Sequence, residues 1–273
     1  MKKRKKQKKI IFWEIGALLA VLILAACVGM STVAGPTEPA VTVQDQPTLP
    51  PNPFTADDFA YEDGYLTCLA QDAALGIDVS VWQDAIDWQQ VKEAGIEFAM
   101  LRIGYRGTDQ GGLNEDAFLR ANYAGAKAAG IKVGGYFFSQ AVSVREAVEE
   151  AEYVLDIIGD WELDMPVVYD WEYIDSEART ANVDARTLTD CTKAFCETVK
   201  KAGFSPMVYF NRDQAKERMY LEELTDYPFW LALYDPAMDY PYRVDMWQYT
   251  CQGIVPGIAG DVDINLYFDY STP

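Results

Sequence analysis

The stretch MPVVYDWEY, from Met165 to Tyr173, is an apolar run that ends in two carboxylates. The three residues after Pro166 favour β-strands, and proline is tolerated at the first positions of a strand. Asp170 and Glu172 project from the same face of an extended chain, with Cα atoms roughly 6.5 Å apart. Burying two acids there is unfavourable unless they meet solvent, hydrogen bonds or a substrate. The stretch therefore predicts either a catalytic strand end or a strand whose aspartate only fixes the following loop.

The segments on both sides of this strand alternate between strand-like and helix-like patterns. Seven other segments have the composition of short strands, namely 75–81, 98–105, 131–139, 205–211, 228–234, 244–250 and 262–267. Four segments have helical spacing of apolar residues, namely 86–95, 115–130, 143–158 and 184–202. Repeated β-α units indicate a parallel sheet, and eight strands in this length indicate closure. We therefore predict an α/β fold, an irregular TIM-like (β/α) barrel of eight strands whose last helices are reduced or missing.

The amino-terminal segment differs from the rest of the chain. A basic flank, residues 1–9, precedes an almost unbroken apolar segment, residues 10–30. This order favours a cytoplasmic flank and export of the remainder of the chain. We expect 10–30 to be a membrane anchor or a signal segment, and the sequence at Cys27 also resembles the lipidation site of bacterial lipoproteins. An extended Pro- and Thr-rich linker, 31–70, would then hold a catalytic barrel, 71–273, outside the cytoplasm at the cell wall.

Charge changes sign after the apolar segment. Residues 31–273 contain 16 of the 23 basic residues and 41 of the 42 acidic ones, a net charge of −25. A nucleic-acid partner is not expected, because binding phosphates requires a basic footprint. We expect a polymer substrate to be held by stacking and hydrogen bonds, and the domain to be a monomer.

The chain contains no histidine, which excludes the usual Ser-His-Asp and Cys-His hydrolases and zinc sites built on histidine. Its five cysteines show no C-x-x-C pairing, which argues against redox or cysteine-based metal sites. Cys68 and Cys251 would approach each other in a closed barrel, so we consider them for a disulfide. Carboxylates and tyrosines remain for proton transfer, and we expect no metal and no organic cofactor.

The barrel topology directs four carboxylates toward one pocket. Asp78 is near the end of the first strand, and Asp263 lies in the last strand, which neighbours the first in a closed barrel. With Asp170 and Glu172 they would raise one another's pKa, so that one acid stays protonated while another ionises, as in a glycosidase. Aromatic residues at the same strand ends would add a wall for stacking sugars: Trp82, Tyr136, Phe138, Tyr209, Trp230, Tyr234, Trp247 and Tyr249.

Several blocks of the sequence resemble, in order, the lysozymes of glycoside hydrolase family 25. They are GIDVSVWQ, IDW, GIEFAMLRIGYRG, NEDAF, GIKVGGYFFSQA, MPVVYDWE, MWQYT and GIAGDVDIN, from about Leu75 to Tyr267. The resemblance implies an incomplete (β/α) barrel that hydrolyses the β-1,4 bond between N-acetylmuramic acid and N-acetylglucosamine in peptidoglycan. It also implies an acidic cluster with Glu172 as the proton donor, made of Asp78, Asp170, Glu172 and Asp263.

On this basis we expect Glu172 to protonate the glycosidic oxygen. Asp170 would act as nucleophile or, as we prefer, would orient the substrate's own 2-acetamido oxygen for attack. Asp78 and Asp263 would hold the sugar and keep Asp170 ionised, and Tyr136 would donate a hydrogen bond near the reacting ring.

One position departs from the family pattern, and two other functions stay open. Phe137 stands where members of the family often have histidine, which puts a fine substrate contact in doubt. A chitinase or endo-N-acetylglucosaminidase could use a similar D-x-E strand. A non-catalytic cell-wall-binding module could keep the fold, although binding alone does not require clustered carboxylates.

Overall fold

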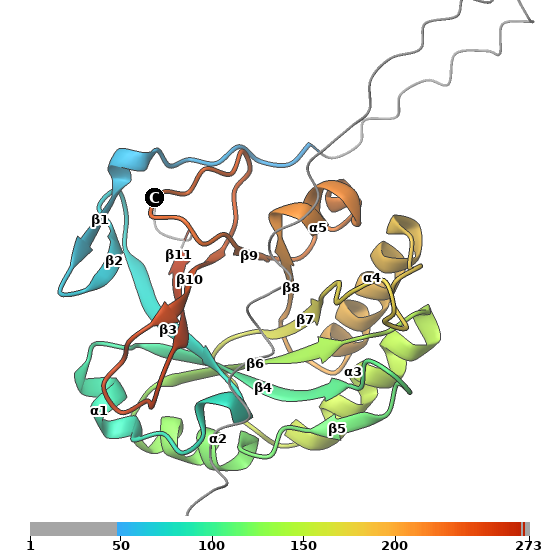
Figure 1. Cartoon of the computed structure of the whole chain (residues 1–273), viewed down its shortest axis with the longest axis horizontal. Helices are drawn as coiled ribbons and strands as arrows, with labels where there is room; N and C mark the ends of the chain where they lie inside the picture. The colour runs from blue at the N-terminus through green and yellow to red at the C-terminus, as the bar shows by residue number, and fades with distance from the viewer. Residues whose placement is uncertain (1–47, 269, 271–273) are drawn as a thin grey trace, which may run out of the picture. The chain divides into compact units, whose positions relative to one another are not determined.

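The structure is a computed structural model that describes residues 48–268 and residue 270, and eight of its strands close into a barrel (Figure 1). In their order around the barrel the strands are β3 (Ala73–Val79), β4 (Phe98–Arg106), β6 (Lys132–Ser139), β7 (Val167–Trp171), β8 (Pro206–Asn211), β9 (Phe229–Ala232), β10 (Met246–Gly253) and β11 (Val262–Phe268). A short strand, β5 (Leu113–Glu115), adds to β4 outside the closed barrel. The predicted eight-stranded, irregular barrel is confirmed.

The last strand runs against the others. The strands from β3 to β10 pair in parallel around the barrel, whereas β11 is antiparallel to both of its neighbours, β10 and β3. Residues 254–261, which connect β10 to β11, contain no helix. A parallel return requires a crossover of a dozen or more residues, usually a helix, so this short connection reverses the chain. The start of β11, with Asp263, therefore lies at the edge of the barrel where the parallel strands end.

The helices are concentrated in the first two thirds of the domain. They are α1 (Trp88–Glu93), α2 (Leu119–Ala128), α3 (Val144–Ile158), α4 (Ala185–Lys201) and the short α5 (Arg212–Glu217). Ser143 caps α3 by accepting a hydrogen bond from the Glu146 amide, and Asp184 caps α4 by accepting one of 2.7 Å from Thr187. In the described chain only a 3₁₀ turn, η3 (Leu221–Glu223), follows α5, so the last helices are reduced or missing as predicted.

Residues 48–70 differ from the extended linker that we expected over 31–70. They form a 3₁₀ turn, η1 (Ala56–Asp58), and an antiparallel pair of strands, β1 (Phe59–Glu62) and β2 (Tyr65–Cys68). The ring of Phe59 packs 5.0 Å from that of Trp247, measured between centroids. Buried aromatic contacts of this kind fix the segment on the barrel beside β10 and β11, where no helices follow the strands (Figure 1).

The remaining amino-terminal segments that we assigned, 1–9, 10–30 and the first part of the linker, lie outside the described residues. Within residues 48–268 and 270, no helix is both long enough and apolar enough to cross a membrane.

The four cysteines in the described part of the chain are free thiols, so the disulfide considered between Cys68 and Cys251 is wrong for this structure. Cys68 is buried in the main core, whereas Cys251 is exposed near the end of β10. Cys191 and Cys196 are both buried on α4, and they are also unpaired.

The barrel interior is apolar at one end and polar at the other. A cluster of side chains from alternate strand positions fills the apolar end: Phe98, Met100, Val168, Met207, Tyr209, Trp230, Ala232 and Met246. Side chains of a strand alternate between its two faces, so residues two positions further along point into the same interior. Arg102 follows Met100 in this way, Asp170 follows Val168 and Gln248 follows Met246. The interior therefore becomes polar toward the carboxyl ends of the parallel strands.

Candidate active site

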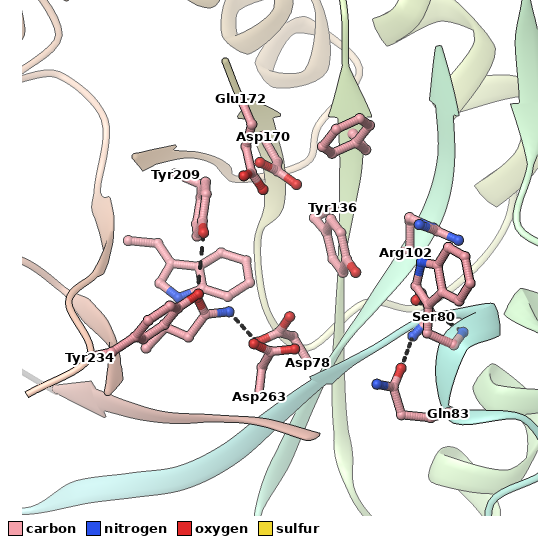
Figure 2. A pocket seen from close by; sticks show the side chains of 14 residues that line it. Asp78, Ser80, Gln83, Arg102, Tyr136, Asp170, Glu172, Tyr209, Tyr234 and Asp263 are labelled. Carbon is pink, nitrogen blue, oxygen red and sulfur yellow. Dashed lines mark hydrogen bonds between the residues drawn. The ribbon is translucent and has the colours of Figure 1, made fainter. Parts of the chain in front are cut away.

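A cavity of about 250 Å³ occupies this polar end of the barrel (Figure 2). All four acids selected from the sequence line it, which brings together residues from three different strands or strand ends. The complete lining is Asp78, Ser80, Trp82, Gln83, Arg102, Tyr136, Phe138, Asp170, Glu172, Tyr209, Trp230, Tyr234, Gln248 and Asp263. TIM-like barrels place their chemistry at this end, because the loops that follow the strands can vary without changing the core.

Asp78 is the acid with the most hydrogen bonds in the cavity. Its Oδ2 accepts bonds of 2.8 Å from the side-chain amides of Gln248 and Asn265. Behind them, Tyr234 donates to Gln248 Oε1 at 3.0 Å, and the Trp230 indole donates to Asn265 Oδ1 at 2.8 Å. Burial raises the pKa of Asp78 to about 6, while the bonds from Asn265 and Gln248 act in the opposite direction. Asp78 is thus held in place as a carboxylate that can ionise near neutral pH.

Asp170 and Glu172 lie beside each other at the end of β7 (Figure 2). Asp170 is buried, and its Oδ1 has no hydrogen-bond partner among the described residues. Burial, followed by the charges of Glu172 and Asp78, raises the pKa of Asp170 well above its usual range. Burial and the charge of Asp78 also raise the pKa of Glu172. In the protein alone, burial therefore favours the protonated form of Asp170, which differs from the ionised Asp170 that we expected.

Asp263 reaches the cavity from the reversed strand β11. Burial, with the charge of Asp78, raises the pKa of Asp263 to about 8. The pKa of Asp78 therefore lies below that of Asp263, so at neutral pH ionisation is favoured at Asp78 over Asp263. Environments that push carboxylate pKa values apart are the arrangement that acid–base catalysis requires.

Two glutamines hold the backbone at the end of β7. Gln140 Nε2 donates 2.9 Å hydrogen bonds to the carbonyl oxygens of Ser139 and Glu172, and Gln214 Nε2 donates to the carbonyl of Trp171. Because both glutamines are buried, these bonds fix the point from which the Glu172 side chain enters the cavity.

Six of the eight aromatic residues expected to stack against sugars line the cavity, namely Trp82, Tyr136, Phe138, Tyr209, Trp230 and Tyr234. Trp82 and Tyr234 are the most exposed of them, with 79% and 55% of their surfaces accessible. Large exposed rings beside a polar cavity are suited to stacking against sugar rings.

Trp247 and Tyr249 are corrections to the predicted site, because neither lines the cavity. Both are buried in the main core: the Trp247 indole donates to the Leu233 carbonyl, and the Tyr249 hydroxyl accepts from the Leu66 amide. The alternation of side chains along β10 explains the error, since Gln248 occupies the inward position between them.

Four polar residues of the lining were not predicted from the sequence, namely Ser80, Gln83, Arg102 and Gln248. Each lies in one of the sequence blocks that resemble family 25 lysozymes, but residue type alone does not indicate which face of a strand a side chain occupies. Ser80 and Gln83 are paired across the turn η2 (Val81–Gln83), where Gln83 Oε1 accepts from the Ser80 amide at 2.9 Å. Counting alternate positions from Met100 would have pointed to Arg102.

Phe137, the residue that departs from the family pattern, does not line the cavity. Phe137 is fully buried on the outer face of β6, and its ring lies 6.3 Å from that of Tyr153 on α3. The neighbouring Tyr136 and Phe138 are the β6 residues that line the cavity.

Among the described residues, no group of three or more acidic or cysteine side chains is arranged to hold a metal ion.

Known proteins similar to this chain point to the family that the sequence blocks resemble. The sequence profile described as glycosyl hydrolases family 25 matches residues 77–258. Lysozyme M1 of Streptomyces globisporus is 29% identical over 202 residues, which cover 70% of this chain and 67% of that protein.

Two solved structures share the fold. The bacterial lysozyme from Streptomyces coelicolor is 28% identical with a TM-score of 0.61, and the match covers 73% of this chain and 94% of that one. The modular autolysin LytC from Streptococcus pneumoniae, solved in complex with a synthetic peptidoglycan ligand, is 26% identical with a TM-score of 0.64. That match covers 77% of this chain but only 52% of LytC, so this chain corresponds to about half of the larger protein.

Proposed function

The chain belongs to glycosyl hydrolases family 25, and from this we propose that it is a lysozyme that hydrolyses the β-1,4 bond between N-acetylmuramic acid and N-acetylglucosamine in bacterial peptidoglycan. The relatives named lysozyme, and the LytC complex with a synthetic peptidoglycan ligand, support this substrate. The chain spans only part of LytC. The proposal therefore concerns the barrel domain that contains the matched residues 77–258.

The observation that carries the proposal is the meeting of four carboxylates in one cavity. Burial raises the pKa of each of them, and the charge of Asp78 raises the pKa of the other three further. This arrangement destabilises the folded protein at neutral pH, because ionisation is less favourable in the folded state than in the unfolded state. Binding alone does not require such a cluster, whereas splitting acid from base in glycoside hydrolysis does. The cluster therefore argues against a non-catalytic wall-binding module.

Glu172 is the general acid in this proposal. Its side chain is longer than that of Asp170 and follows the last residue of β7, so it can extend toward the leaving oxygen. Burial and the charge of Asp78 raise its pKa, which favours the protonated form that a general acid requires. The hydrogen bond from Gln140 to the Glu172 carbonyl fixes its position.

Asp170 assists at the anomeric carbon. Its unpartnered Oδ1 is suited to accept the N–H of the substrate's 2-acetamido group. Such a bond favours the ionised carboxylate, and it would lower the raised pKa of Asp170 on substrate binding. Attack by the acetamido oxygen or by Asp170 itself retains the β configuration in the first product, whereas a directly activated water inverts it. Proton NMR of the fresh product separates these outcomes, and an initial α anomer would exclude both retaining routes.

The reaction is tested by the new reducing ends that the enzyme creates. Purified peptidoglycan is digested, the fragments are reduced with borohydride, and their reduced ends are identified by mass spectrometry. We expect muramitol ends. Glucosaminitol ends would instead support the endo-N-acetylglucosaminidase alternative, and cleavage of chitin oligosaccharides at a comparable rate would support the chitinase alternative.

We propose further that the domain works outside the cytoplasm on a membrane tether. The basic flank and apolar segment of residues 1–30 support this, and so does a substrate that lies outside the membrane. The tether is either a signal-anchor helix or a lipid on Cys27.

A further inference from the structure

Arg102 is the one basic residue among the side chains that line the described cavity. Its guanidinium is held on one edge by Asp116, whose Oδ2 lies 2.8 Å from Nε and 2.7 Å from Nη2. The Arg102 Cζ also lies 5.3 Å from the centre of the Tyr105 ring. A guanidinium fixed by a carboxylate and an aromatic ring is preorganised, so little conformational entropy remains to be lost on binding a ligand.

Asp116 has further partners that explain why this geometry is rigid. Its Oδ2 also accepts a 3.0 Å hydrogen bond from the Val81 amide, and its Oδ1 accepts one of 2.9 Å from the Phe118 amide. Asp116 thus joins the turn η2 and the start of α2 to Arg102, and only 1% of its side chain is exposed. In contrast, Nη1 of Arg102 makes no hydrogen bond within the described residues. The guanidinium therefore has unused donors while its residue lines the cavity.

The position of Arg102 relative to the acids follows from the strand register. Arg102 on β4 pairs with Tyr136 on β6, and β6 pairs with β7, which carries Asp170. Arg102 is therefore two strands away from Asp170, a lateral distance of about 10 Å. In Figure 2 Tyr136 is drawn between Arg102 on one side and the pair Asp170 and Glu172 on the other. A sugar ring on Asp170 would present its neighbouring substituents toward Tyr136 and Arg102.

Muramic acid carries a substituent that a cation at the position of Arg102 could recognise. Its C2 carries the acetamido group that Asp170 would receive, and the adjacent C3 carries a lactyl ether that ends in a carboxyl group. Where a stem peptide is attached, the lactyl carboxyl is an amide and the nearest carboxylates belong to the peptide. Either carboxylate would enter a cavity with Asp78, which can ionise near neutral pH, and Asp170, whose ionised form the substrate would favour; juxtaposed like charges weaken binding unless a cation offsets them.

We propose that Arg102 binds a carboxylate of the muramic-acid residue or of its stem peptide and so selects peptidoglycan over glycans without that group. The inference rests on the proposed function. Arginine recognises carboxylates through paired N–H donors, and Nη1 together with the outer hydrogen of Nη2 presents such a pair on the edge away from Asp116. In this role Arg102 determines specificity and takes no part in proton transfer.

The experiment compares three substrates with the same glycan backbone. The first is intact peptidoglycan with stem peptides, the second is glycan stripped of peptides by an amidase so that lactyl carboxylates are free, and the third is the stripped glycan after its carboxylates have been converted to neutral amides. Initial rates at subsaturating substrate give kcat/KM for the full chain and for Arg102→Gln.

Control variants separate substrate recognition from the loss of the buried ion pair. Asp116→Asn breaks the same pair but keeps the guanidinium, and Arg102→Gln/Asp116→Asn leaves no unpaired buried carboxylate and so guards against misfolding. Circular dichroism and thermal melting show which variants are folded.

We expect both variants that lack Arg102 to lose about 10-fold to 100-fold in kcat/KM on a carboxylate-bearing substrate relative to the amidated glycan. A loss confined to stripped glycan assigns the lactyl carboxylate, and a loss on intact peptidoglycan assigns a carboxylate of the stem peptide. Asp116→Asn should keep the preference of the wild type. An equal loss on all three substrates would overturn the inference, whereas a wild-type protein that cleaves none of them would refute the proposed function itself.

Discussion

Asp78 on β3 and Asp263 on β11 are direct partners across an antiparallel pair of strands. Side chains at such positions lie roughly 4.5–5.5 Å apart at Cβ, and like charges directly opposite each other are destabilising. Both residues line the cavity, and burial is the largest cause of the raised pKa of each. The reversal of β11 thus builds an unfavourable acid pair into the fold at the place where the substrate is expected.

The first prediction concerns the stability of this pair. The pKa of Asp263 is 3.8 without the folded environment and about 8 within it, so between these values the folded protein binds more protons than the unfolded one. Stability should therefore fall as pH rises from about 4 to about 8. Asp263→Asn removes this penalty, and we expect it to be more stable than the wild type at pH 8 by about 1 kcal/mol or more.

Urea unfolding at pH 4.5 and pH 8 measures this difference. The advantage of Asp263→Asn should be largest at pH 8 and should shrink at pH 4.5, where the wild-type acid is protonated. Equal stabilities of variant and wild type at pH 8 would show that Asp263 is not held in its neutral form.

The second prediction concerns the pH dependence of kcat/KM. Burial and then the charge of Asp78 raise the pKa of Glu172, which must be protonated to act as the acid. Asp78→Asn removes that charge, so the alkaline limb of the profile should move to lower pH. Asp263→Asn is the matched control, because Asp263 is already neutral near pH 7 and its replacement should move the limb less. If the alkaline limb of Asp78→Asn stays at the wild-type pH, the charge of Asp78 does not raise the pKa of the general acid.

The third prediction tests how the acid is positioned. Gln140→Met removes the donor to the Glu172 carbonyl but keeps a side chain of similar length. We expect kcat to fall about 10-fold or more with little change in KM, because small displacements of a reacting group have large effects on rate. Thr192→Val is the control, since it removes a buried hydrogen bond to the Leu188 carbonyl on α4. If both variants lose stability and neither loses kcat, Gln140 has only a structural role.

The sequence predicted the fold better than it predicted the lining of the site. All eight barrel strands and the first four helices were found because apolar periodicity and capping residues act locally. The direction of β11 was not found, because it depends on the length of its connection to β10. Trp247 and Tyr249 were misplaced and Gln248 was missed for one reason: a shift of one position moves a side chain to the other face of a strand.

The fourth prediction concerns the tether of residues 1–30. Protease added to intact cells should digest the catalytic domain and leave a membrane-bound stub. An inhibitor of lipoprotein processing then distinguishes the two anchors, because only a lipidated Cys27 responds to it. Full-length protein that remains protected in intact cells would contradict a location outside the membrane.

The most direct test of the mechanism is the rate of Glu172→Gln on two substrates. Glutamine keeps the shape of Glu172 but has no proton to transfer, so hydrolysis of peptidoglycan should fall by roughly 10²-fold or more. On a muramic-acid-containing glycoside with a nitrophenyl leaving group, which departs without protonation, bond cleavage should fall far less, whereas Asp170→Asn should impair both substrates. A folded Glu172→Gln protein that clears peptidoglycan at nearly the wild-type rate would contradict the assignment of Glu172 as the acid.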